Sequence, residues 1–224
     1  MQPISAGTCE ICGEGMAGFA RADEIQACGN CREARPSFEK ACAYGSYEGV
    51  LRELIHLLKY EQVEPAANAL GGMLAEAIGK QKISEPVLMI PVPLHVSKRR
   101  QRRFNQAELI ARAALKHAVG SGAKLETKCL VRTRATVSQI GLTRPQRAEN
   151  IRGAFRVENR DRIAGRSILL VDDVLTTGTT ASECARVLRK AGAEKVWVAT
   201  VARTLKHSDA NFAVEPDFEV AEAS

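Results

Sequence analysis

One stretch of thirteen residues limits what this chain can fold into more than any other. Four apolar residues, Ile168–Val171, predict a short buried strand, and two acids, Asp172 and Asp173, stand where that strand should end and should face solvent. A loop of small hydroxyl residues around Gly178 follows, and apolar residues then recur at helical spacing. This order is typical of an open α/β sheet, in which ligands bind beyond the carboxyl ends of the strands.

The loop carries the groups that a phosphate needs. Free backbone N–H groups, hydroxyl donors and the positive end of a helix dipole should coincide there. The residues concerned are Thr176, Thr177, Gly178, Thr179 and Thr180. Adjacent carboxylates accept hydrogen bonds from sugar hydroxyls, so Asp172 and Asp173 complete a predicted site for a ligand with a ribose and a terminal phosphate.

Two other interpretations exist for this stretch. It can be a core strand followed by a capped turn, which the residues alone leave open. It can also be the acidic strand of a P-loop ATPase, but that class needs a Gly-x-x-x-x-Gly-Lys-Ser/Thr loop upstream. The one Gly-Lys pair in the chain, Gly79-Lys80, is followed by Gln81, so the P-loop class is excluded.

Four cysteines near the N-terminus have the spacing of a metal site. Cys9, Cys12, Cys28 and Cys31 form Cys-x2-Cys-x15-Cys-x2-Cys, which is typical of four-thiolate zinc. Two disulfides or free thiols are the alternative. Because all four ligands come from protein, the predicted zinc is structural. The other three cysteines lack such spacing and should be small buried residues.

Charge is unevenly distributed along the 224 residues, whose formal net charge is +6. Residues 98–166 hold 18 Lys and Arg against 5 Asp and Glu, and the rest of the chain is mildly acidic. A basic block of this kind favours polyanionic partners. The densest run, Lys98–Arg103, follows the predicted strand Val87–Ile90 and the prolines Pro91 and Pro93; it is either a ligand-binding turn or a solvated one.

A polar stretch, residues 131–155, is too long to be a simple connector. Stretches of this kind are binding loops, lids or exposed flexible loops, and the residues do not decide between these. The predicted polyanion contacts of the block and this stretch together are Arg99, Arg100, Arg102, Arg103, Arg134 and Arg147.

Several motifs together resemble one protein family. After the cysteines come Tyr47-Glu48-Gly49, Leu57–Tyr60, Pro91–Leu94 and Arg103–Gln106. The stretch Ile168–Thr180 itself resembles the phosphoribosyl pyrophosphate (PRPP) loop of type I phosphoribosyltransferases. The whole set resembles the ComF family of competence proteins, from Cys9 to Thr204, with one departure: Arg103 stands where the family has glycine.

The resemblance implies a parallel α/β sheet of the type I phosphoribosyltransferase kind, flanked by helices, behind a small N-terminal zinc-binding module with four cysteine ligands. The implied division is 1–43 for the zinc module and linker, 44–206 for the transferase-like domain and 207–224 for an acidic tail. Asp172 and Asp173 would hold the ribose hydroxyls, the Thr/Gly loop the 5′-phosphate, and the segment 134–152 would be a mobile lid. Mg²⁺ would accompany PRPP.

Two classes of function remain open from the sequence. The chain can bind PRPP, with or without transfer to an unknown acceptor, in a role linked to natural DNA uptake. It can instead be a non-catalytic adaptor that binds single-stranded DNA beside a DNA-uptake helicase, although aromatic residues are only 4% of the chain. No signal peptide or membrane span is visible, so we expect a cytoplasmic protein with reduced cysteines.

Overall fold

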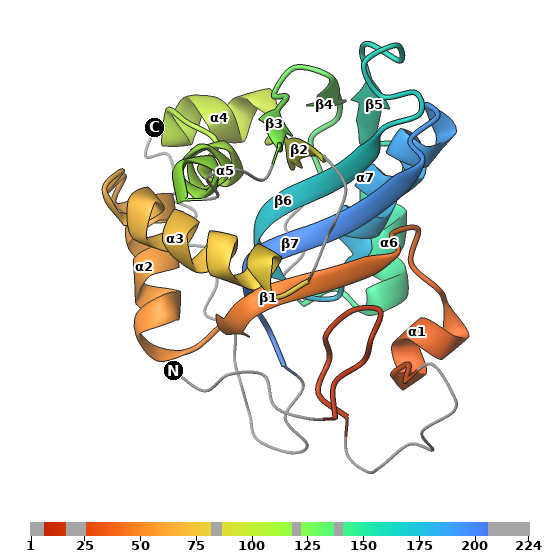
Figure 1. The fold of residues 1–224 in the computed structure, drawn as a ribbon, viewed down its shortest axis with the longest axis horizontal. Coiled ribbons are helices and arrows are strands. Elements are labelled where there is room, and N and C mark those ends of the chain that lie inside the picture. The colour runs from red at the N-terminus through yellow and green to blue at the C-terminus, as the bar shows by residue number, and fades with distance from the viewer. Residues whose placement is uncertain (1–6, 17–25, 82–86, 118–121, 137–140, 206–224) are drawn as a thin grey trace, which may run out of the picture.

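The computed structural model describes residues 7–16, 26–81, 87–117, 122–136 and 141–205, and the acidic tail predicted at 207–224 lies outside them. Five parallel strands form one sheet in the order β1-β7-β6-β2-β3 (Figure 1). Their bounds are β1 Lys40–Ser46, β2 Leu88–Pro91, β3 Lys124–Leu125, β6 Ser167–Leu175 and β7 Lys195–Arg203. The predicted parallel α/β sheet is confirmed. Within these described ranges, no helix is long and apolar enough to cross a membrane.

Helices cover both faces of the sheet (Figure 1). On one face lie α2 Gly49–Tyr60, α3 Ala66–Gly79 and α5 Gln106–His117. The buried residues Leu51, Ile55 and Leu58 of α2 recur at helical spacing and join this core. On the other face lies α7 Thr179–Lys190, whose Cys184, Ala185 and Leu188 are fully buried. These two apolar layers fix the orientation of the central strands.

Strand β6 is longer than the sequence predicted. It continues through both acids to Leu175, and its ladder with β7 runs to the Leu175–Arg203 pair. Backbone pairing with β7 therefore outweighs the low strand propensity of aspartate. The phosphate-loop candidate consequently begins at Thr176, directly after the strand.

The cation run is a helix rather than a turn. Helix α4, Val96–Arg102, begins at His95, whose ring nitrogen accepts from the Ser97 N–H at 3.4 Å. Lysine, arginine and glutamine are good helix formers, which explains the difference. Arg103 ends the helix at φ +65°, a left-handed conformation that glycine adopts without strain. The glycine that the resemblance implies at this position would adopt the same conformation without strain.

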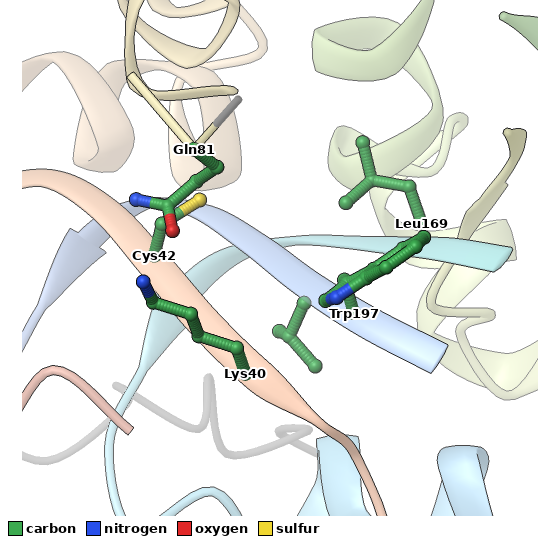
Figure 2. A pocket seen from close by; sticks show the side chains of 6 residues that line it. Lys40, Cys42, Gln81, Leu169 and Trp197 are labelled. Carbon is green, nitrogen blue, oxygen red and sulfur yellow. The ribbon is translucent and has the colours of Figure 1, made fainter. Parts of the chain in front are cut away.

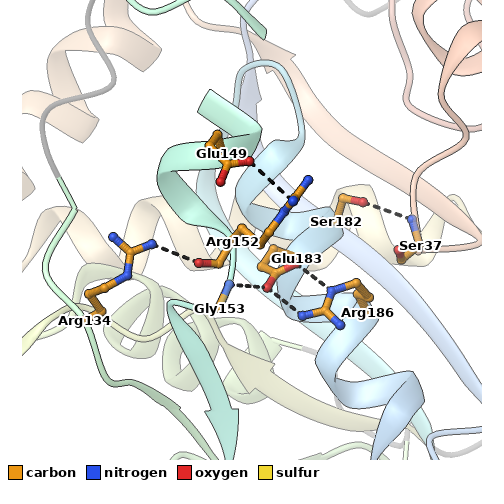
Figure 3. Close-up of polar contacts among 8 residues, drawn as sticks. All are labelled: Ser37, Arg134, Glu149, Arg152, Gly153, Ser182, Glu183 and Arg186. Atoms are coloured by element: carbon orange, nitrogen blue, oxygen red, sulfur yellow. Dashed lines mark hydrogen bonds and ion pairs between the residues drawn. The ribbon is translucent and has the colours of Figure 1, made fainter. Parts of the chain in front are cut away.

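The polar stretch is largely ordered into elements of its own. Strands β4 Leu130–Arg132 and β5 Phe155–Val157 pair antiparallel, and helix α6 Arg144–Ile151 lies between them in sequence. A capping box joins Thr143 and Gln146 at the start of α6. Figure 3 shows how the end of α6 is attached to α7: the Gly153 N–H donates to Glu183 at 2.8 Å, and Arg186 forms two bonds to the same carboxylate. Residues 141–153 are therefore docked on α7, and residues 137–140 lie outside the described chain.

The cysteine segment packs directly on the sheet. The Ala41 N–H of β1 donates to Ile11 O at 2.7 Å, and the short helix α1, Gly29–Glu33, carries Cys31. The four cysteines share one buried cluster with Phe38 and Ala41. The resemblance implied a domain boundary between residues 43 and 44. Strand β1 runs across this position, since its ladder with β7 begins at Lys40.

Candidate functional site

The phosphate-loop candidate joins β6 to α7 at the carboxyl edge of the sheet. Gly178 has φ +76° and caps the helix, and the Ser182 N–H donates to Gly178 O at 2.8 Å. The first N–H groups of a helix have no carbonyl one turn earlier, so they are the natural donors to an anion. The hydroxyl oxygens of Thr177 and Thr179 lie 3.0 Å apart. Thr176 is exposed and the next four loop residues are half-buried, so the loop is accessible to a ligand.

The two acids lie on opposite faces of β6, because side chains alternate along a strand. Asp173 points to the face covered by α2, where Lys59 Nζ lies 2.7 Å from its Oδ2. The side chain of Lys59 is 17% exposed and that of Asp173 only 6%. The expectation that both acids face solvent is wrong for Asp173, since the last turn of α2 covers it. Asp172 keeps a partly exposed position.

The acids differ in charge for physical reasons. Burial and then the charge of Asp173 raise the pKa of Asp172 to about 8. Against its own burial, Asp173 has its pKa held below the ordinary range by Lys59, with a further contribution from Arg102. The charge of Asp173 in turn raises the pKa of Lys59 despite burial. At this edge Asp173 is therefore the acid that ionises first, Asp172 holds its proton more firmly beside it, and cations lie nearby.

Arg102, in the last turn of α4, lies close to this edge of the sheet. Its guanidinium lies over the Tyr60 ring, 5.3 Å from the centroid, and Tyr60 directly follows Lys59 at the end of α2. Arg102 is half-buried, whereas Lys98, Arg99, Arg100 and Arg103 are exposed. On the opposite face, Arg132 lies within electrostatic range of Asp172 and stacks on Phe155 at 5.5 Å.

The two predicted contacts in the polar stretch bond to their own segment. Arg134 Nη2 donates to the carbonyls of Asn150 and Arg152, at 2.9 Å each, and so caps the end of α6. Figure 3 shows the bond to Arg152. Arg147 Nε donates to Leu142 O at 2.9 Å. Both arginines hold the docked segment together, and their contact with a polyanion stays a prediction.

A small cavity lies far along the sheet from this edge. It has a volume of about 30 Å³ and is lined by Lys40, Cys42, Gln81, Leu169, Trp197 and Val198 (Figure 2). Lys40 begins β1 and Trp197 lies near the start of β7, so the cavity belongs to the amino ends of the strands. It has room for about two waters. Burial raises the pKa of the Cys42 thiol to about 12. Because it lies at the amino ends of the strands, the cavity is separate from the candidate site at their carboxyl ends.

Comparisons with known proteins agree with this geometry. A family model described as phosphoribosyl transferase domain matches residues 125–222. DNA utilization protein YhgH of Escherichia coli K12 is 32% identical over 182 residues, covering 80% of this chain and 78% of the relative. Competence protein F of Haemophilus influenzae is 31% identical over 200 residues, covering 87% and 84%. This chain belongs to the ComF family.

A solved structure is also similar to this ComF family member. The phosphoribosylpyrophosphate synthetase of Mycobacterium smegmatis superposes with a TM-score of 0.38 at 19% identity. The match covers 61% of this chain and 34% of that chain.

The four cysteines of this family member form a cage of the size that a metal requires. Their sulfurs all lie within 4.8 Å of one another, and those of Cys12 and Cys28 are 3.7 Å apart. Four sulfurs at about 2.3 Å from a tetrahedral ion are about 3.8 Å apart, so the donor set fits. Burial would raise the pKa of Cys9, but backbone hydrogen bonds lower it to about 7, whereas burial raises the pKa of Cys12 to about 11 and also raises that of Cys31. Sulfurs crowded in this way become thiolates together when a cation binds between them.

A buried arginine joins this cage to the sheet. Arg203, the last residue of β7, donates from Nη2 to Glu14 Oε2 at 2.8 Å and to Cys12 Sγ at 3.4 Å. The side chains of Arg203 and Glu14 are 4% and 9% exposed. The neighbouring Thr204 N–H donates to Leu175 O at 3.1 Å, one residue before the phosphate loop. The cysteine cage is therefore connected to the same edge of the sheet.

Reasoning from the sequence missed three charged residues of this edge, namely Lys59, Arg132 and Arg203. Lys59 had a detectable signal: it lies four residues after the buried Ile55, so its position on α2 faces inward. An inward-facing lysine on an amphipathic helix requires a partner. Arg203 had a signal of the same kind, because it directly follows the apolar run Val196–Ala202 at the end of a strand. Nothing in the sequence around Arg132 distinguishes it from the other cations.

Proposed function

We propose that this ComF family member binds PRPP or a related phosphoribosyl ligand at the carboxyl edge of its sheet. The 5′-phosphate is received by Thr176–Thr180 and the ribose hydroxyls by Asp172, the more accessible acid of the pair. The observation that carries the proposal is the junction of β6 and α7, where a hydroxyl-rich loop with a left-handed Gly178 opens a helix directly beyond two acids.

The charges around the loop suit this ligand. Cations close to the acids, Lys59 and Arg102 on one face and Arg132 on the other, are placed to balance a polyanion. Mg²⁺ would supply further neutralisation of the diphosphate when bound. Transfer of the ribosyl group to an acceptor is an alternative for the same site, and fold alone does not establish it.

Calorimetric titration with Mg–PRPP tests the proposal. The double variant Thr177→Val with Thr179→Val removes two hydroxyls without changing side-chain shape, and should weaken binding about tenfold. Thr8→Val, in the cysteine segment, is the matched control and should bind as the wild type does. Absence of binding by the wild-type protein would refute the proposal, and equal affinity in the double variant would refute the loop assignment.

The metal of the cysteine cage is proposed to be structural zinc. Four thiolates leave no open coordination position, and a cytoplasmic location, which we also propose, keeps such thiols reduced. Purified protein should carry about one zinc per chain. Cys28→Ser should release it and expose β1 to rapid hydrogen exchange, because the cage packs on Ala41. Fresh reduced protein that contains no zinc would refute this assignment.

The relatives named for competence and DNA utilization support a role in natural DNA uptake. We place the protein on the cytoplasmic side of that process, where a DNA-uptake helicase is the proposed partner. The basic helix α4 offers the charge that a nucleic-acid-handling assembly requires.

Single-stranded DNA binding is a second candidate function, favoured by one specific observation. The sequence is poor in aromatic residues, yet Tyr60 is 44% exposed, lies 4.7 Å from the His56 ring and contacts Arg102 beside the exposed cations of α4. A stacking surface next to a row of cations is the usual arrangement for single strands.

This candidate has its own measurement. Neutralising Arg99 and Arg100 together should reduce the salt slope of single-strand affinity by about 0.7 for each phosphate that the protein no longer neutralises. The reduction in affinity should be uniform across sequences, because phosphate contacts carry no base information. An unchanged slope would show that α4 does not contact the DNA. Competition by Mg–PRPP would show that both ligands bind the same surface.

A further inference from the structure

The linker between the cysteine cage and β1, residues 34–39, lies against the phosphate loop. The Phe38 ring packs on Gly178, with Cε1 and Cζ each 3.8 Å from the position that a β-carbon would take there. One residue earlier, the Ser37 N–H donates to Ser182 Oγ in the first turn of α7 at 3.0 Å (Figure 3). Phe38 also shares a buried cluster with the four cysteines. The linker therefore joins the segment that carries the cage to the loop.

A second connection runs through Arg203, the last residue of β7. Its Nη2 donates to Cys12 Sγ at 3.4 Å. The N–H of the next residue, Thr204, donates to Leu175 O at 3.1 Å, and the phosphate loop begins at Thr176 directly afterwards. One side chain and one peptide unit thus connect a cysteine of the cage to the start of the loop.

Arg203 makes this second connection sensitive to what the cage holds. Its side chain is 4% exposed, and Nε and Nη1 have no hydrogen-bond partner among the residues that the structure describes. A buried guanidinium with open donors depends on nearby negative charge. Glu14 supplies one such charge, and four thiolates around a divalent ion supply more, because together they carry a net negative charge. Metal in the cage should therefore hold Arg203, and with it the end of β7, more firmly.

The phosphate loop is the part of the candidate site that gains from being held. The two connections reach it before Thr176, through Leu175, and again at Gly178 and Ser182. A loop loses conformational freedom when it closes on a ligand, and this loss opposes binding. Because a loop that is already held loses less, contacts on both sides of this loop should raise its affinity for a ligand.

We propose that the cage positions the phosphate loop, so that metal binding in the cage and ligand binding at the loop favour each other. Phe38, Ser182 and Arg203 are the positioning residues of this coupling. By linkage, the factor by which the metal raises the affinity for the ligand equals the factor by which the ligand raises the affinity for the metal. The part that concerns the ligand rests on the proposed function, whereas the ordering of the loop by the metal does not.

Hydrogen exchange, followed by NMR, tests the ordering of the loop without any ligand. The Ser182 N–H, bonded to the carbonyl of Gly178, and the Thr204 N–H, bonded to the strand residue before the loop, report on it. In full-length protein stripped of zinc by a chelator, both should exchange at least about fivefold faster than in zinc-loaded protein. The Glu126 N–H, bonded to Met89 O on the other side of the sheet, is the internal control and should be unchanged. Equal rates in the two forms at residues 182 and 204, or equal acceleration of all three amides, would overturn the inference.

A variant that lacks both polar contacts shows whether they carry the effect. Arg203→Met, Glu14→Gln and Ser182→Ala together remove the cation, its buried partner charge and the acceptor of the Ser37 N–H. In this variant, removal of zinc should accelerate exchange at residues 182 and 204 less than about twofold. Ser182→Ala alone keeps the buried pair and serves if the combination does not fold: it should reduce the zinc effect at residue 182 and leave that at residue 204. The full wild-type zinc effect at residue 182 in either variant would overturn the inference.

Arg189→Met is the matched control. Arg189 Nη1 donates to Glu39 Oε1 at 2.8 Å, so the variant removes a contact between the linker and the far end of α7. It leaves both connections to the phosphate loop in place and should therefore show the full zinc effect at residues 182 and 204. Loss of the effect in this variant would overturn the assignment to the two connections.

Calorimetric titration with Mg–PRPP, after removal of the chelator, measures the coupling itself. Zinc-stripped wild-type protein should bind at least about fivefold more weakly than the zinc-loaded form, and the two forms of the combined variant should agree within about twofold. Measurable but equal affinities of the two wild-type forms would overturn the coupling. A wild-type protein that binds no Mg–PRPP in either form would instead refute the proposed function, and the exchange rates would still decide whether the metal orders the loop.

Discussion

The Lys59–Asp173 pair lies two residues before the end of β6 and the Arg203–Glu14 pair lies at the end of β7, so two buried ion pairs lie on neighbouring strands of one sheet. Their surroundings differ. The cysteine segment closes over Arg203 and Glu14, whose side chains are 4% and 9% exposed, while Lys59 remains 17% exposed at the edge of the sheet. The closed pair has a fixed partner and serves the structure. The more open pair can meet a ligand without disturbing the core.

The closed pair should give the largest effect on stability. Arg203→Met removes the cation beside the buried Glu14 carboxylate, which costs about 3–5 kcal/mol of unfolding free energy. Chemical denaturation measures this loss. Adding Glu14→Gln removes the buried negative charge and should recover much of the stability. A loss below about 1 kcal/mol, the usual size for an exposed pair, would show that this pair is not closed in solution.

Breaking the open pair should cost less. Lys59→Met is expected to lose about 2 kcal/mol, because Arg102 still stabilises the charge of Asp173 and water reaches this edge. The same denaturation experiment gives the comparison directly. A cost equal to that of Arg203→Met would contradict the difference between the pairs.

The pH dependence of stability should also distinguish the acids at the open edge. The folded-state pKa of Asp172, about 8, lies above its unfolded value of about 3.9, so the folded protein holds an extra proton between these limits. Stability contributed by this proton is lost as the pH rises from about 4 to about 8. Asp172→Asn should remove that decline when unfolding is followed across this range.

Asp173 acts in the opposite direction. Its pKa is lowered in the folded state, so its contribution is present above its unfolded value and is lost as the pH falls towards the folded one. The two acids therefore affect separate pH windows. If the free energy of unfolding declined above about pH 4 by the same amount in Asp172→Asn as in the wild type, the assignment of this decline to Asp172 would be wrong.

The smallest effect concerns the turn after α4. Arg103 has φ +65°, so Arg103→Gly should stabilise the protein by about 0.5–1 kcal/mol through relief of backbone strain. This substitution touches neither ion pair, and thermal unfolding measures it. Arg103→Ala is the control, because it removes the charge while keeping the strain, and should bring no such gain.

The sequence predicted the parts of this molecule that depend on local pattern. The apolar stripe of α2, the strand before the acids and the spacing of the four cysteines each indicate one structure whatever the rest of the chain does. The parallel sheet followed from the alternation of strands and helices together with the family resemblance. The phosphate loop was located because glycine and threonine stand directly after a strand.

The remaining features depend on contacts between distant residues. Asp173 was expected to face solvent because nothing near it in sequence indicates Lys59, which lies more than a hundred residues earlier. The extension of β6 to Leu175 depends on its partner Arg203 in β7. Helix α4 was missed because a run of like charges suggested a turn, although each residue in it from Lys98 to Arg102 is a good helix former.

The crystal structure of the protein grown with Mg–PRPP is the most direct test of the proposed ligand site. The account predicts the 5′-phosphate on the N–H and hydroxyl groups of Thr176–Thr180, the ribose beside Asp172, and the diphosphate against Lys59 and Arg102. Density for the ligand on the exposed outer face of α4, or at the amino ends of the strands, would contradict it.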